Sequence, residues 1–232
     1  MGWLSLATVH QSLVKPDERG AVFQRYMRRW AGSLVRSSGG AVELTPESRL
    51  PSGPGPRLIV ANHRSPFDIG ILLSIFGGHA VSRADLASWP ILGLAARRAG
   101  TIFVDRQDPG SGASAIRAIR RRLREGASVL IFPEGSTFEG DEVRPFKAGV
   151  FAALPRQGVE IVPVGLAYDP GVEWIDETFV NHVLRVANRP RTRCLVSVGT
   201  PRPVGARAPE LAQLLRDDVQ QLVQHARASF QP

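Results

Sequence analysis

Cysteine, lysine and long apolar runs are all scarce in this sequence. Cys194 is the single cysteine among 232 residues, which excludes a disulfide within the chain and favours a reducing compartment. No run reaches the about 18 apolar residues that a transmembrane helix needs. The residues after Met1 also lack the basic start and long apolar core of a signal peptide. We therefore expect any membrane contact to be peripheral.

Acidic residues are also fewer than basic residues. The chain has 29 Lys and Arg against 21 Asp and Glu, a net charge of +8, and its lysines are Lys15 and Lys147. This charge favours anionic partners such as phosphate-bearing substrates or an anionic membrane surface. Zinc-ligand spacing, an aromatic RNA-binding signature and a basic low-complexity tail are missing, so we expect neither a metal site nor a nucleic-acid partner.

Short apolar segments alternate with helical patterns along the chain. The predicted strands are residues 41–44, 58–61, 79–82, 101–104, 127–132, 160–166 and 194–198. The predicted helices are residues 18–36, 69–76, 89–98, 113–125, 146–154 and 209–229. Strands that are apolar throughout are typical of a sheet covered on both faces. The pattern predicts an α/β fold with a mixed, mostly parallel sheet flanked by helices.

The segment of residues 18–36 is amphipathic. Its apolar side chains recur at helical spacing on one face: Phe23, Met27, Trp30 and Leu34. Its arginines lie on the other face: Arg25, Arg28, Arg29 and Arg36. The helix either packs on the domain core or lies at a membrane surface with its arginines at anionic headgroups. We divide the chain here, into residues 1–38, with membrane contact, and a domain of residues 39–232.

The segment from Asn62 to Asp68 places an imidazole and a carboxylate five positions apart, directly after a predicted strand. Ser65 and Pro66 are typical of an N-cap and a first helical turn, which puts Asp68 at the third helical position. There its carboxylate can hydrogen-bond one nitrogen of His63 and make the other nitrogen a better base. The alternative is that Asp68 only complements the helix dipole and His63 is a polar loop residue.

Three further motifs follow in order. They are Gly100-Thr101-Ile102-Phe103-Val104-Asp105-Arg106, Phe132-Pro133-Glu134-Gly135-Ser136-Thr137 and Ile161-Val162-Pro163-Val164. The ordered set resembles the glycerolipid acyltransferase family, whose type member is 1-acyl-glycerol-3-phosphate acyltransferase. That family carries N-H-x4-D, G-x-I-F-x-x-R, F-P-E-G-T-R and V-P-V/I, and the resemblance covers roughly residues 40 to 205. It implies a membrane-associated O-acyltransferase of phospholipid biosynthesis.

Acyl transfer from a thioester to an alcohol needs a base for the hydroxyl group. We assign His63 as that base and Asp68 as the group that orients it. The sequence has no G-x-S-x-G elbow, so direct attack within a ternary complex is expected instead of an acyl-enzyme. The expected donor is acyl-CoA or acyl-carrier protein, and no further cofactor is expected. The expected location is the cytoplasmic face of the membrane.

The remaining site residues are predicted to bind substrate. Asn62 is placed beside the base and holds its loop. The resemblance implies that Arg106 binds the acceptor phosphate, although an ion pair with Asp105 or Asp108 is an alternative. Glu134 is expected to bind hydroxyl or amine groups of the acceptor, and Gly135 to allow a tight turn. The resemblance links Pro163 to the acyl or acceptor pocket, and a strand-edge proline is the alternative.

The third motif departs from the family pattern, because Ser136 and Thr137 stand where Thr-Arg is usual. The missing arginine would bind phosphate, so two acceptors compete: lysophosphatidate and an amino-acid-containing lysolipid. Residues 132–147 and 81–93 resemble the branch that contains lyso-ornithine lipid acyltransferases. Lys147 either replaces the missing charge or is an ordinary residue at a helix start. A non-catalytic lipid-binding relative is a further alternative, which the intact His63, Asp68 and Glu134 oppose.

Overall fold

The computed structural model describes residues 2–15, 18–53, 55–89, 92–105, 107–155 and 158–230. Within them, seven strands form one sheet in the order β1-β7-β6-β2-β5-β3-β4, and β8 pairs with β6 beside this path. The strands are β1 (Gly40–Leu44), β2 (Arg57–Ala61), β3 (His79–Arg83), β4 (Ile102–Val104), β5 (Val129–Ile131), β6 (Glu160–Tyr168), β7 (Thr192–Val198) and β8 (Arg202–Pro203). The β6–β7 and β6–β8 pairs are antiparallel and the other pairs are parallel.

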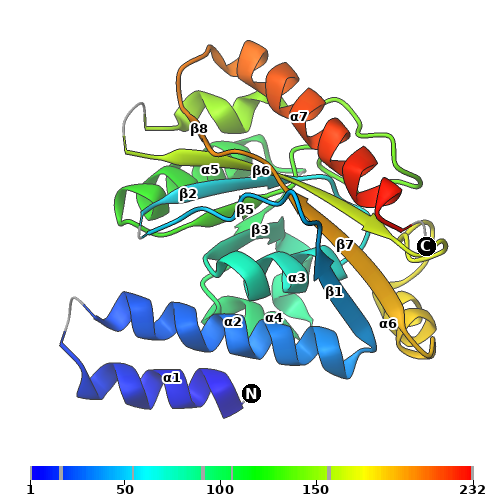
Figure 1. Cartoon of the computed structure of the whole chain (residues 1–232). Helices are drawn as coiled ribbons and strands as arrows, with labels where there is room; N and C mark the ends of the chain where they lie inside the picture. Colours follow the sequence, from blue (N-terminus) through cyan, green and yellow to red (C-terminus); the bar gives the residue numbers. More distant parts are fainter. Residues whose placement is uncertain are drawn as a thin grey trace.

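Helices cover both faces of the sheet (Figure 1). They are α1 (Gly2–Leu13), α2 (Arg19–Ser37), α3 (Phe67–Phe76), α4 (Leu92–Arg98), α5 (Pro109–Arg124), α6 (Phe179–Ala187) and α7 (Ala208–Ala228), with 3-10 helices η1 (Ala84–Ser88) and η2 (Ala148–Ala153). Along β2, Ile59 packs with α2 and α3, while Leu58 and Val60 pack with α5 and α7. This alternation leaves no polar face on the strand, and the predicted fold class is confirmed.

The predicted elements are present with shifted ends, and four elements of the described residues were not predicted: α1, η1, α6 and β8. The predicted helix of residues 89–98 is present as α4, which begins at Leu92, and η1 ends before the predicted range. Trp89 is extended, with φ −72° and ψ 134°, because a proline that follows a residue disfavours its helical conformation. The predicted helix of residues 146–154 is the short 3-10 helix η2.

The apolar side of α2 belongs to the core. Met27, Ala31 and Val35 are buried, and Phe23 and Trp30 pack against them while partly exposed. The core-packing alternative is therefore confirmed for this part of the face, whereas Leu34 is 43% exposed, and the interfacial alternative stays a prediction. No helix in the described part of the chain is long and apolar enough to span a membrane. The division of the chain at residue 38 stays a prediction.

Further exposed apolar side chains of the N-terminal region lie on α1. Leu6, Val9 and Leu13 are 54%, 60% and 79% exposed. They are spaced three and four residues apart, so they share one side of the helix. Next to these side chains α1 contacts α2, where the His10 ring meets the Tyr26 ring edge-on at 5.8 Å between centroids.

Candidate active site

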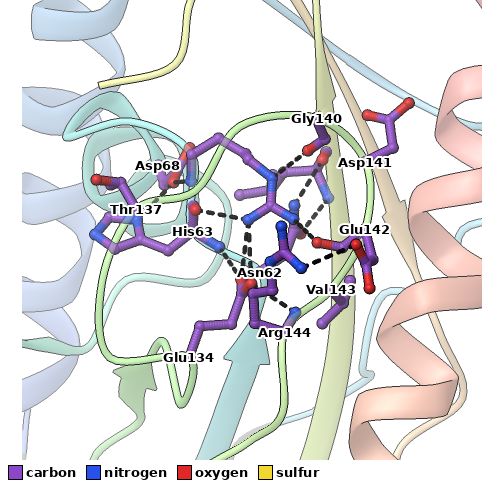
Figure 2. Close-up of polar contacts among 12 residues, drawn as sticks. Asn62, His63, Asp68, Glu134, Thr137, Gly140, Asp141, Glu142, Val143 and Arg144 are labelled. Atoms are coloured by element: carbon purple, nitrogen blue, oxygen red, sulfur yellow. Dashed lines mark hydrogen bonds and ion pairs between the residues drawn. The ribbon is translucent and has the colours of Figure 1, made fainter. Parts of the chain in front are cut away.

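Two of the predicted motifs meet where two neighbouring central strands of the sheet end. The parallel strands β2 and β5 are neighbours, so the loops that follow them leave the sheet side by side. In this position His63 Nδ1 lies 2.7 Å from Asp68 Oδ2 (Figure 2). The imidazole also stacks on Phe132, with ring centroids 4.1 Å apart and planes 14° apart. A carboxylate on Nδ1 places the proton on that nitrogen and leaves Nε2 with a free lone pair.

Asp68 is held by donors on both carboxylate oxygens. Its Oδ2 accepts from the backbone N–H groups of Arg64 at 2.7 Å and Ser65 at 3.0 Å, besides His63. The N-cap of α3 is Pro66, not the predicted Ser65, so Asp68 is the second helical residue. The Asp68 carboxylate therefore turns back onto the loop, where the N–H groups hold it against the imidazole. Its side chain has no exposed surface.

Tyr168 on β6 completes this arrangement and was not predicted. Its hydroxyl donates to Asp68 Oδ1. Burial and the neighbouring Asp68 charge raise the pKa of Tyr168 well above its usual value, so the phenol keeps its proton. Burial likewise raises the pKa of the Cys194 thiol, which makes it a poor nucleophile. No spacing in the sequence points to Tyr168, because its contact with Asp68 crosses 100 residues.

Glu134 has a different role from the predicted one. Its carboxylate forms a buried ion pair with Arg64, at 3.0 Å and 3.2 Å from Nη1. It also accepts from the backbone N–H groups of His63 at 2.7 Å and Arg144 at 2.9 Å. The Glu134 side chain is 0% exposed, so no acceptor group can reach these oxygens. Glu134 joins the two motif loops and holds the backbone of the base.

The side chains of Asn62 and Pro163 are buried. The Asn62 amide binds the Leu166 backbone in both directions, with Nδ2 to O at 2.9 Å and N to Oδ1 at 2.8 Å. This clamp anchors the end of β2 to β6 and supports the loop-holding role. Pro163 is buried in β6 beside Val60, and its carbonyl accepts from Gly199 at 2.9 Å. Both side chains are therefore structural, which corrects the predicted substrate contacts.

A cleft of about 1120 Å³ opens beside His63. Motif residues form one part of its wall: Phe132, Gly135, Ser136, Thr137 and Lys147. Helices α2 to α5 supply apolar lining, for example Trp30, Leu73, Ala96 and Ile116. The cleft can therefore place a long apolar substrate against the imidazole. Arg106 lies outside the described residues, so its predicted phosphate contact stays a prediction.

The segment from Trp174 to Phe179 forms another part of the wall and was not predicted. The Trp174 backbone N–H donates to Arg64 O at 2.8 Å, and Thr137 Oγ1 donates to Trp174 O at 2.7 Å. These bonds tie the segment to both motif loops. Asp176 within it has φ +46°, the left-handed region that few residues other than glycine adopt.

The Lys147 side chain lies across the third motif. Gly135 has φ +81°, and a Cβ at this position would lie 2.6 Å from Lys147 Nζ. The glycine therefore serves both the tight turn and the approach of the ammonium group. Lys147 and Asp176 both line the cleft, and neither forms an ion pair within the described part of the chain.

The chain is similar to known acyltransferases. The Acyltransferase family profile matches residues 41–167. Lyso-ornithine lipid O-acyltransferase of Pseudomonas aeruginosa is 34% identical over 194 residues, 78% of this chain and 70% of that protein. A 1-acyl-sn-glycerol-3-phosphate acyltransferase of Neisseria gonorrhoeae is 32% identical over 118 residues, 51% of this chain and 46% of that protein. The chain thus spans 70% of the first relative and less than half of the second.

The fold is also found in a solved structure. The crystal structure of the 1-acyl-sn-glycerophosphate acyltransferase PlsC from Thermotoga maritima superimposes with a TM-score of 0.71 at 18% identity. The match covers 97% of this chain and 88% of that one. The two chains therefore share a fold over nearly the whole of this chain.

Proposed function

The chain belongs to the acyltransferase family, and we propose that it transfers a fatty acyl group from a thioester to the hydroxyl of a lysolipid. One observation carries the proposal. The His63 imidazole, held at 2.7 Å by the buried Asp68 carboxylate, lies in the wall of a largely apolar cleft. The donor is acyl-CoA or acyl-carrier protein, and both supply the same thioester carbon.

The proposed reaction needs one base and no covalent enzyme intermediate. His63 Nε2 takes the proton of the acceptor hydroxyl as its oxygen attacks the thioester carbonyl carbon. The tetrahedral intermediate then collapses, the carbon–sulfur bond breaks, and the proton passes from the imidazolium to the thiolate. Asp68 stabilises the imidazolium, and Tyr168 with the loop N–H groups keeps that carboxylate in place.

Release of free thiol tests this proposal directly. Purified protein is incubated with acyl-CoA, or with acyl-carrier protein, and a panel of lysolipids, and both thiol and acylated lipid are measured. We expect one thiol released for each ester formed, and no release without an acceptor. A protein that binds lysolipid but releases no thiol with either donor is the non-catalytic relative instead.

For the acceptor we propose an amino-acid-containing lysolipid such as lyso-ornithine lipid. Thr137, at the usual arginine position, uses its hydroxyl on Trp174 O, so it offers no charge to a phosphate. The cleft instead carries an ammonium on Lys147 and a carboxylate on Asp176, neither of which has an ion-pair partner among the described residues. An amino-acid headgroup has the matching pair, a carboxylate and an ammonium group. Lysophosphatidate is the second candidate, since Arg106 occupies the matching position of the second motif.

Thr137→Arg is expected to change acceptor preference. The new guanidinium adds a bidentate donor for a phosphate monoester. We expect the ratio of kcat/KM for lysophosphatidate over lyso-ornithine lipid to rise roughly tenfold, or about 1.4 kcal/mol. Thr137→Gln is the matched control, because it removes the same hydroxyl without adding charge. A wild type that already strongly prefers lysophosphatidate, with an unchanged ratio in Thr137→Arg, contradicts the amino-acid acceptor.

We also propose peripheral attachment to the cytoplasmic face of the membrane through α1. Its exposed Leu6, Val9 and Leu13 supply an apolar contact, and the net charge of +8 favours anionic lipid. Replacing all three by serine is expected to abolish most sedimentation with phosphatidylglycerol vesicles. Binding of the wild type should weaken as salt rises, because salt screens exposed charges. Leu214→Ser on α7, where Leu214 is 43% exposed, is the control; equal loss in both variants contradicts the α1 site.

A further inference from the structure

A chain of three polar side chains lies beside the catalytic motif: Ser65 and His182 are buried, and Glu177 is 19% exposed and lines the cleft. His182 on α6 has 0% exposure. Its Nε2 lies 2.8 Å from Ser65 Oγ, and its Nδ1 lies 2.9 Å from Glu177 Oε1. Ser65 is the residue between His63 and Asp68 whose backbone N–H binds Asp68 Oδ2 at 3.0 Å. The reaction proposed above uses neither His182 nor Glu177.

Hydrogen-bond chemistry sets the direction of this chain. Burial lowers the pKa of His182 despite the neighbouring Glu177, so the imidazole is neutral. The hydrogen bond from Arg185 lowers the pKa of Glu177, which is therefore a carboxylate. Nδ1 has two neighbours, Glu177 Oε1 at 2.9 Å and Arg185 Nη2 at 3.2 Å, and we assign its proton to the shorter contact with the carboxylate. Nε2 is then an acceptor, and the Ser65 hydroxyl donates to it. The same hydroxyl oxygen accepts the Phe67 N–H at 3.3 Å at the start of α3.

The same residue types form the nucleophilic triad of serine hydrolases, but this geometry does not serve that chemistry. Ser65 is 0% exposed, and the described cleft wall includes Pro66 and His63 but not Ser65. A substrate carbonyl therefore cannot reach Oγ. Ser65 instead contacts groups that position His63. Its backbone N–H donates to Asp68, and its hydroxyl oxygen accepts from the first turn of α3.

We propose that Glu177, His182 and Ser65 form a positioning relay that holds the His63–Asp68 pair in its reactive geometry. The relay also couples the His63–Asp68 pair to the cleft wall. Glu177 lies in the wall segment of residues 174–179, whose Trp174 backbone N–H donates to Arg64 O. The catalytic loop is thus held on two sides. Glu134 and Arg64 hold one side, and His182 holds the other. This inference rests on the proposed acyl transfer and adds residues that it does not otherwise need.

The test compares two replacements of His182. His182→Leu removes the acceptor for the Ser65 hydroxyl, whereas His182→Gln keeps a side-chain oxygen within reach of it. We expect kcat to fall by about 10²-fold in His182→Leu, since a shift of the base by about 1 Å costs that much. KM for the thioester should stay nearly constant, and His182→Gln should recover part of the rate. Leu184→Ala on the exposed side of α6 should keep the wild-type rate.

A double-mutant cycle separates positioning from general destabilisation. If His182 acts through Asp68, its replacement should add little to the loss already caused by Asp68→Asn. Thermal midpoints of all variants are measured alongside the rates. Additive losses, or equal rates in His182→Leu and wild type, overturn the relay. The acyl-transfer proposal fails separately, if the wild type itself releases no thiol with any donor and acceptor.

Discussion

Replacing His63 with alanine is expected to lower kcat/KM by roughly 10²–10⁴-fold, the usual contribution of a positioned base. The geometry makes this residue the base, because Asp68 occupies Nδ1 at 2.7 Å, Nε2 keeps its lone pair, and His63 lines the cleft. The side chain is 16% exposed, so its removal leaves a small partly open space and little loss of stability. The measurement is steady-state thiol release, with thermal midpoint and circular dichroism as checks of folding.

Asp68→Asn gives a second measure of the same step. The amide cannot stabilise the imidazolium, so turnover should also fall sharply. This variant costs stability as well, because Asp68 accepts from Tyr168, His63 and two backbone N–H groups, and an amide has only one oxygen to offer. His63→Ala is therefore the cleaner test. Near-normal turnover by folded His63→Ala protein would falsify the general-base role.

The contact between His63 and Asp68 could be predicted because it is local. Only five residues separate the end of β2 from the start of α3, and this short loop brings the two side chains together without help from distant parts of the chain. The alternation of apolar strands and helices likewise determines a sheet covered on both faces. These features follow from chain geometry over fewer than about ten residues.

The supporting residues could not be predicted, because their contacts are made across the sheet. Tyr168 meets Asp68 and His182 meets Ser65 only after β6 and α6 are placed, 100 and 117 residues along the chain. Glu134, in contrast, was predicted to be a site residue but with a different role. A carboxylate in a glycine-containing loop after a strand is typical of a substrate ligand, and only its burial with Arg64 reveals that it holds the loops.

The Glu134–Arg64 pair is expected to be among the costliest interactions to break. Glu134→Gln leaves the Arg64 guanidinium buried without a counter-charge, and removing one partner of such a pair costs about 3–5 kcal/mol. The Glu134 carboxylate also accepts hydrogen bonds from the backbone N–H groups of His63 and Arg144. In the glutamine variant the amide NH2, a donor, would face one of these two donors. The free energy of unfolding, from urea titration, measures the loss.

The two roles considered for Glu134 give different results in this variant. An acceptor ligand would raise KM for the lysolipid and leave unfolding unchanged. A residue that holds the loops should lower both the stability and kcat, with KM for the thioester nearly constant. Glu210→Gln is the matched control, because its pair with Arg207 is 53% and 85% exposed and such pairs contribute no more than about 1 kcal/mol. If Glu134→Gln and Glu210→Gln unfold at the same urea concentration, the buried pair does not hold the catalytic loop.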